Sequence, residues 1–298
     1  MRLGKVVTDA TPSIVVETGD GDWRNLTSGA LIMTMGNAAA ALCAGSVGQI
    51  AKSCPAIDLD GLVLMPPVDQ NARIFCAGFN FGAHAKESDR DIPKQPTFFA
   101  RFPSSFVGHD QPIVRPAAST SLDWEGELAL MIGRSGRHIP IASAYDHVAG
   151  YCPMGEHSVR EYQLHGTQAT AGKNFDRCGG LGPCIVDKDA CPSPSEMEVL
   201  THLNGERMQQ GKLSDLIFDI PTLINYISTF TELRPGDIIA TGTPPGIGGR
   251  MSPPRWLAPG DVISIHIPSI GTLTNRVEDE LIPLDLPVRA SDPEFLSR

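Results

Sequence analysis

The segment from Leu122 to Ile132, Leu-Asp-Trp-Glu-Gly-Glu-Leu-Ala-Leu-Met-Ile, combines a strand-like apolar pattern with three acidic residues. Side chains alternate between the two faces of a strand, so most apolar residues would share one face and Asp123, Glu125 and Glu127 the other. Three carboxylates on one face repel one another unless water or a cation neutralises them, and oxygen-rich clusters suit hard ions such as Mg²⁺, Mn²⁺ or Ca²⁺. The segment therefore predicts either a half-exposed strand whose acidic side chains face water, or one wall of a metal site.

A second acidic and polar segment follows at 150–163, Gly-Tyr-Cys-Pro-Met-Gly-Glu-His-Ser-Val-Arg-Glu-Tyr-Gln. A metal site needs ligands from more than one part of the chain, and this segment offers Glu156. His157 beside it offers a ring nitrogen, but hard ions prefer oxygen ligands, which favours a core or surface role for this histidine. The second segment strengthens the metal-site interpretation.

Composition limits the classes of protein to which the chain can belong. Its 298 residues are enough for one large domain with an appendage or for two modest domains, and its 41% hydrophobic content is that of a globular protein. The net charge of -10 and the lack of a Lys/Arg cluster argue against nucleic-acid binding. The seven cysteines form no C-x-x-C pair and are odd in number, which fits a reducing compartment, so we expect a cytoplasmic location.

The stretch 25–51 carries no charged residue and is long enough to suggest a membrane span. It is dominated by Ala, Gly, Ser and Thr, however, and lacks the density of Leu, Ile and Phe that makes insertion favourable. We therefore expect one or two buried helices there and no membrane association.

The rest of the sequence predicts a β-rich α+β protein. Pro66-Pro67 marks a boundary between a small N-terminal domain, residues 1–68, and a main domain, residues 69–298. A buried strand is expected at Ile74–Gly78, and two Pro-Gly-Asp turns later in the chain precede further apolar strands. Apolar residues at spacings of three and four predict a helix over Ile217–Ile227.

Several motifs resemble those of the fumarylacetoacetate hydrolase family, in the family's order and over roughly residues 70 to 282. The stretch Asp123–Leu128 resembles its paired-glutamate strand, and the segment around Glu156 resembles the strand and turn that follow. The resemblance implies that Glu125, Glu127 and Glu156 bind a divalent metal, Mg²⁺, Mn²⁺ or Ca²⁺. Glu156 stands where the family normally has Asp preceded by Asn; here the preceding residue is a glycine, and Glu is one methylene longer than Asp.

The same resemblance assigns catalytic roles to three residues. Gly78–Glu87 resembles a segment with a water-activating pair, His84 and Glu87, which would share one face of a helical turn. The carboxylate would orient the imidazole and raise its basicity, although H-x-x-E alone is common on solvated helices. Lys173, within Ala171–Asp176, would stand beside the metal and stabilise developing enolate charge.

Four residues would contact the substrate: Arg101, Gln163, Gly242 and Thr243. The glycine and the threonine belong to a stretch that resembles the family's late glycine-rich loop, which receives the substrate carboxylate. Gln163 matches a substrate-contacting glutamine. Arg101 stands where many relatives have Lys, which keeps the charge but changes the geometry.

The family's fold is a mixed β-roll with a smaller N-terminal domain, usually in a homodimer, and the resemblance implies both for this chain. It also implies an enzyme that cleaves a carbon-carbon bond in a small 2,4-dioxo acid, of the acylpyruvate or fumarylpyruvate type, through an enolate. Hydratase, isomerase or decarboxylase action on a 2-oxo acid uses the same intermediate and is the first alternative. An alternative of another class, suggested by Gly155-Glu156, is a metal-impaired relative that binds a ligand without turnover.

Overall fold

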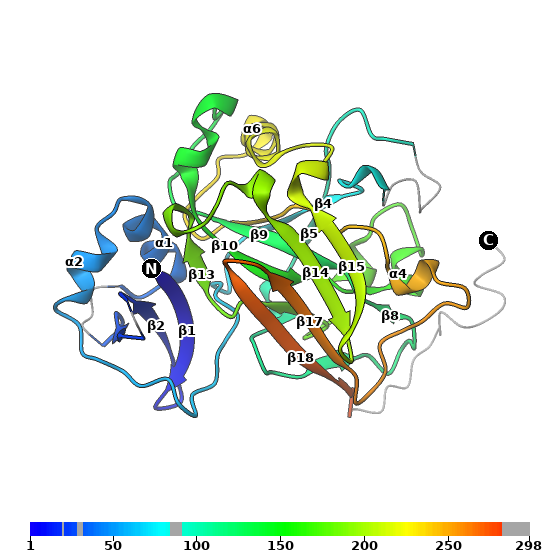
Figure 1. Ribbon diagram of the computed structural model, residues 1–298, viewed down its shortest axis with the longest axis horizontal. Helices are drawn as coiled ribbons and strands as arrows, with labels where there is room; N and C mark the ends of the chain where they lie inside the picture. The colour runs from blue at the N-terminus through cyan, green and yellow to red at the C-terminus, as the bar shows by residue number, and fades with distance from the viewer. Residues whose placement is uncertain (20, 29–31, 84–90, 282–298) are drawn as a thin grey trace.

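The computed structural model describes residues 1–19, 21–28, 32–83 and 91–281, and its main feature is a sheet of eleven strands (Figure 1). Pairing is antiparallel except between β16 and β4 and between β12 and β6. The strands of the main path are, in order, β3 (Trp23–Asn25), β2 (Thr11–Glu17), β1 (Arg2–Thr8), β13 (Ile185–Asp187), β10 (Val148–Gly155), β9 (Gly126–Ile132), β16 (Ile238–Ala240), β4 (Ile74–Gly78) and β5 (Thr97–Arg101). Beside β10 lies β12 (Gly179–Leu181), which pairs in turn with β6 (Phe106–Val107).

A second sheet of five strands packs against the large one and lies in front of it in Figure 1. Its strands are, in order, β15 (Glu206–Lys212), β14 (Glu198–Leu203), β17 (Val262–Ile267), β18 (Gly271–Asp279) and β7 (Ile113–Arg115). Leu128 and Leu130 of β9 and Ile265 of β17 belong to the apolar layer between the two sheets. A short pair, β8 (Leu122–Asp123) with β11 (Ser158–Val159), lies next to the end of β9. This two-sheet arrangement confirms the prediction of a β-rich fold.

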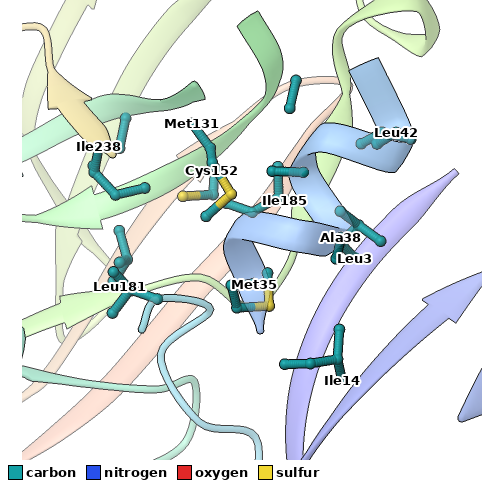
Figure 2. Close-up of a cluster of buried hydrophobic side chains, with 14 of the residues drawn as sticks. Leu3, Ile14, Met35, Ala38, Leu42, Met131, Cys152, Leu181, Ile185 and Ile238 are labelled. Atoms are coloured by element: carbon teal, nitrogen blue, oxygen red, sulfur yellow. The ribbon is translucent and has the colours of Figure 1, made fainter. Parts of the chain in front are cut away.

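The N-terminal residues extend the large sheet, because β1 pairs with β13. The uncharged stretch forms α1 (Met35–Cys43) and α2 (Val47–Ala51), as expected. Figure 2 shows Met35, Ala38 and Leu42 of α1 against Met131 of β9 and Ile185 of β13, so this helix covers the face of the sheet opposite the five-stranded one. The N-terminal segment thus shares a core with the main sheet, and the boundary at residue 68 stays a prediction.

Strand β9 is buried on both faces, which its own sequence pattern does not indicate. Ala129 and Met131 pack into the α1 layer, whereas Leu128 and Leu130 pack into the layer between the sheets. The interpretation of a half-exposed strand with water-facing carboxylates is therefore wrong, since a second layer covers each face.

Helix α6 (Ile220–Phe230) lies at the top in Figure 1 and begins three residues later than the predicted Ile217. Asp219 caps it by accepting a hydrogen bond from the Thr222 N–H at 2.9 Å, and Pro221 suits the first turn. Most of the predicted apolar stripe is buried, at Ile220, Leu223, Ile224 and Ile227. The strand at Ile74–Gly78 and the strands after the two Pro-Gly-Asp turns lie where the sequence places them.

Replacing Asp219 with alanine is expected to lower the free energy of unfolding by about 1 kcal/mol, because the Thr222 N–H loses its acceptor. Urea denaturation of the two proteins measures the difference. Asp219→Asn keeps a hydrogen-bond acceptor, so its free energy of unfolding should fall much less. An unchanged midpoint for the alanine variant would contradict the capping role.

The other helices of the described residues are short: α4 (Arg160–Gln163) and α5 (Thr170–Lys173), with 3-10 turns η1 (Pro103–Ser105), η2 (Ile141–His147), η3 (Lys188–Ala190), η4 (Pro194–Glu196), η5 (Leu213–Asp215) and η6 (Gly248–Arg250). Across the described ranges, no helix has the length and apolar character needed to cross a membrane.

Candidate metal centre and active site

The acidic residues lie where two pairs of antiparallel strands meet. β9 pairs with β10 as far as Gly126 opposite Gly155, and pairing resumes between β8 and β11. The two residues between these pairs on each strand belong to neither ladder, and here the Glu156 N–H donates to the Glu125 carbonyl at 2.8 Å. This break places Glu125 and Glu156 opposite each other.

Three carboxylates meet at this break. One oxygen from each of Glu125, Glu127 and Glu156 lies within 4.8 Å of the others, and all three residues are buried. The additional methylene of Glu156 therefore does not keep its carboxylate from the other two. The structure brings together the three residues that the sequence predicts as metal ligands.

Lys173 lies at the end of α5, between two of these carboxylates. Its Nζ donates to Glu125 Oε1 at 2.9 Å and to Glu156 Oε2, and it lies 4.9 Å from the centre of the Phe99 ring. Burial disfavours the ammonium form, but Glu125 and Glu156 outweigh burial and raise the pKa of Lys173 above its usual value. Lys173 is therefore charged, and it is suited to donate hydrogen bonds to a developing oxyanion rather than to accept a proton.

Arg101, at the end of β5, lies behind Glu156. Its NH1 group donates to Glu156 Oε1 at 2.9 Å and to the His157 carbonyl at 3.2 Å, and its Nε donates to Ser105 Oγ at 3.1 Å. The side chain has no exposed surface. In this structure Arg101 neutralises Glu156, and its contact with a substrate stays a prediction.

Asp123 connects three parts of the site although it is not one of the three clustered carboxylates. It accepts hydrogen bonds from the Gly248 N–H at 2.7 Å, the Gly249 N–H at 3.0 Å and Arg160 Nε at 2.8 Å. Arg160 also donates to Gln163 Oε1 at 2.9 Å, so the predicted substrate-contacting glutamine is half-buried beside it. Asp123 therefore fixes Arg160 and the end of the glycine-rich loop to the acidic strand.

The glycine-rich loop contacts the cluster through its backbone. The Gly242 N–H donates to Glu127 Oε2 at 2.8 Å, and the φ of +102° at Gly242 favours glycine. The Thr243 hydroxyl donates to the Gly126 carbonyl at 3.0 Å and accepts from Gln209 Nε2 at 2.9 Å. Both residues thus hold the loop against β9, and their contact with a substrate stays a prediction.

Glu127 is the carboxylate whose negative charge is least neutralised by nearby side chains. Within the part of the chain that the structure describes, no Lys or Arg side chain forms an ion pair with it. Burial, and then the charges of Glu156 and Glu125, raise the pKa of Glu127 well above its usual value. A cation at this position would relieve the repulsion.

The formal charges of the site favour a divalent cation. Four negatively charged side chains face three positively charged ones, which leaves one negative charge: Asp123, Glu125, Glu127 and Glu156 against Arg101, Arg160 and Lys173. Clustered carboxylate oxygens are the donors that Mg²⁺, Mn²⁺ and Ca²⁺ prefer. The residues present therefore fit such an ion, and the site with its ion would carry one positive charge, which suits an anionic substrate.

Sequence reasoning missed the ion pairs of Arg160 with Asp123 and Glu125. It also missed the hydrogen bond that the His157 ring accepts from the Glu125 N–H. The sequence did offer one indication of an ion pair, because Arg160 is the only Lys or Arg within the acidic segment 150–163. His84 and Glu87 lie outside the described residues, so their predicted pairing stays a prediction.

Comparisons with known proteins agree on one family. Residues 73–278 match the model described as fumarylacetoacetate (FAA) hydrolase C-terminal. The chain is 36% identical to the mitochondrial oxaloacetate tautomerase FAHD2A of Homo sapiens, over 76% of this chain and 73% of that protein, and 41% identical to the oxaloacetate tautomerase YisK of Bacillus subtilis, over 74% of each. A solved fumarylacetoacetate hydrolase from Exiguobacterium antarcticum superposes with a TM-score of 0.82 at 33% identity, covering 94% of this chain and 100% of that one.

Proposed function

Since the chain belongs to the fumarylacetoacetate hydrolase family, we propose that it is an enzyme that interconverts the keto and enol forms of a small 2-oxo acid. The tautomerases of Homo sapiens and Bacillus subtilis, which this chain matches over about three quarters of its length, support this choice of reaction and suggest an oxaloacetate-like dicarboxylate. The buried cluster of three glutamates around a charged lysine carries the proposal.

Glu125, Glu127 and Glu156 would hold the divalent ion, with Mg²⁺ or Mn²⁺ first and Ca²⁺ as the alternative. When bound, the ion supplies Lewis-acid polarisation of the 2-oxo group and attraction for the carboxylate beside it. The identity of the ion stays a prediction.

The protein's own groups would stabilise the negative charge that develops on the substrate and would move its proton. Enolisation moves a proton from C3 of the acid and places negative charge on the C2 oxygen. Lys173 Nζ, charged and hydrogen-bonded between Glu125 and Glu156, would donate to that oxygen as its charge develops. His84, which Glu87 would orient, is the candidate that would move the C3 proton. The burial of the cluster excludes water and strengthens these electrostatic interactions.

Hydrolysis of a carbon-carbon bond in a 2,4-dioxo acid is the second candidate. The solved fumarylacetoacetate hydrolase that matches 94% of this chain supports it. The reaction would need the same charge stabilisation by Lys173, with the His84 and Glu87 pair activating a water molecule. The homodimeric state and the cytoplasmic location also stay predictions.

The test is turnover of a panel: oxaloacetate, followed as loss of the enol absorbance, and acylpyruvates, fumarylpyruvate and a 2-oxo-4-enoate. Each is assayed with added Mg²⁺ or Mn²⁺ and with a chelator. We expect chelator-sensitive acceleration of oxaloacetate tautomerisation. Chelator-sensitive cleavage of an acylpyruvate or fumarylpyruvate instead would favour the hydrolase. No turnover of any panel compound, with protein that binds no added metal, would contradict both the tautomerase and the hydrolase proposals and favour a ligand-binding role.

A further inference from the structure

The break between the strand pairs places the buried Glu125 N–H outside both ladders. Glu125 belongs to neither ladder. A buried N–H without a hydrogen bond is strongly unfavourable. In this structure the N–H donates to Nδ1 of the His157 ring at 3.3 Å. At this position a side chain, and not a strand carbonyl of either ladder, is the acceptor.

The ring lies in a space that a glycine provides. A Cβ atom at Gly155 would lie 2.6 Å from His157 Nε2 and 2.8 Å from its Cε1, closer than real contacts allow. His157 is fully buried, and within the described residues its Nε2 has no hydrogen-bond partner. The ring is therefore held by shape on one side and by its Nδ1 bond on the other. Any side chain at position 155 would compete with it.

The next residue in the chain, Ser158, also contacts Glu125. Ser158 Oγ donates to Glu125 Oε1 at 2.5 Å, while the His157 carbonyl accepts from Arg101. Because the Glu125 N–H donates to it, Nδ1 of His157 is the acceptor nitrogen of the ring. Residues 157 and 158 thus fix both the backbone and the carboxylate of Glu125.

We propose that His157 is a positioning residue of the carboxylate cluster: its Nδ1 fixes the backbone of Glu125 opposite Glu156, and Gly155 is required to admit the ring. His157 would act through Glu125 and not as a metal ligand. The effect on metal affinity rests on the proposed metal site, whereas the effect on the stability of the metal-free protein does not.

Two substitutions separate the acceptor from the volume of the ring. In His157→Asn the side-chain oxygen can take the place of Nδ1, whereas His157→Leu keeps the bulk without an acceptor. We expect the leucine variant to bind Mn²⁺ about 10–100-fold more weakly, the range found when residues behind metal ligands are replaced. The asparagine variant should retain the affinity of the parent. The Mn²⁺ dissociation constant is measured by electron paramagnetic resonance of the free ion, and the melting temperature is measured without metal.

Thr201→Val is the matched control. Thr201 Oγ1 is also buried without a partner among the described residues, and it faces Gly126. Because it makes no hydrogen bond to Glu125, its loss should leave the Mn²⁺ affinity unchanged. A loss equal to that of His157→Leu would contradict the specific role of the Nδ1 bond.

Gly155→Ala tests the same fit without removing the ring, and it covers the case in which His157→Leu does not fold. Alone it should lower both Mn²⁺ affinity and the melting temperature, but in a His157→Asn background, where the ring is absent, its additional effect should be much smaller. Additive effects, or equal affinities for His157→Leu and His157→Asn, would overturn the proposal. A parent protein that binds no Mn²⁺ would instead contradict the proposed function, while the order of melting temperatures would still test the role of His157.

Discussion

Lys173→Met is expected to lower turnover of the preferred panel substrate by about 10²–10³-fold, because it removes the charged donor that would stabilise the enolate oxygen. It should also lower the free energy of unfolding of the metal-free protein by about 3–5 kcal/mol, the usual effect of removing one partner of a buried ion pair. The Lys173 side chain is only 2% exposed, and Glu125 and Glu156 would be left without it. Steady-state kinetics and chemical denaturation measure the two effects.

Lys173→Arg is the control for charge. It keeps the positive charge but presents a planar fork instead of a single ammonium group, so it should recover stability better than turnover. Lys188→Met, at an exposed pair with Asp189, is the control for loss of a lysine elsewhere. Turnover by Lys173→Met within about tenfold of the parent would contradict the assigned role, because one lost oxyanion donor costs more than that.

Glu127→Gln is expected to have effects of opposite sign on stability and on function. Without metal, it removes a buried carboxyl group whose ionisation burial and the neighbouring carboxylates oppose. The variant should therefore be more stable than the parent by about 1–3 kcal/mol near neutral pH. It should also lose the rise in melting temperature that added Mg²⁺ or Mn²⁺ gives the parent. Turnover should fall by at least about 10²-fold, as expected for loss of a metal ligand. Thermal denaturation with and without metal measures the first two effects.

The stability difference between Glu127→Gln and the parent should depend on pH in a defined direction. The pKa of Glu127 is raised in the folded state above the usual 4.5, so the folded parent binds a proton more tightly than the unfolded one. Both states are protonated well below pH 4.5, and the two proteins should then be equally stable. As pH rises above that value, only the parent loses stability, until the folded-state pKa is passed. Glu206→Gln, at an exposed pair with Arg255, should show no such trend.

Local features of this fold could be predicted from the sequence where neighbouring residues determine them. The strand at Ile74–Gly78 is a short apolar run bounded by turns, and it forms as expected. The helix over residues 217–227 was placed three residues early, because apolar spacing does not report the cap at Asp219. Glu125 and Glu127 could be recognised as members of one acidic cluster, because their strand pattern and their family motif coincide.

Pairings over long distances could not be predicted in the same way. Arg101 pairs with Glu156, 55 positions away, and Arg160 pairs with Asp123, 37 positions away. Which cation meets which carboxylate depends on the order of strands in the sheet, which no local pattern reveals. The hydrogen bond of His157 Nδ1 likewise depends on the position at which the two strand ladders end, between Gly126–Gly155 and Asp123–Ser158.

The shared break in the two ladders also limits how this region can change in length. The period of a strand is two, so deleting one residue next to Glu125 or Glu156 would turn every later side chain to the opposite face and separate the carboxylates. The hairpin at Asn204-Gly205, exposed and with positive φ at both residues, carries no such constraint. We therefore expect natural and laboratory variants of this protein to gain or lose residues at that hairpin while the segments 122–132 and 150–163 keep a constant length.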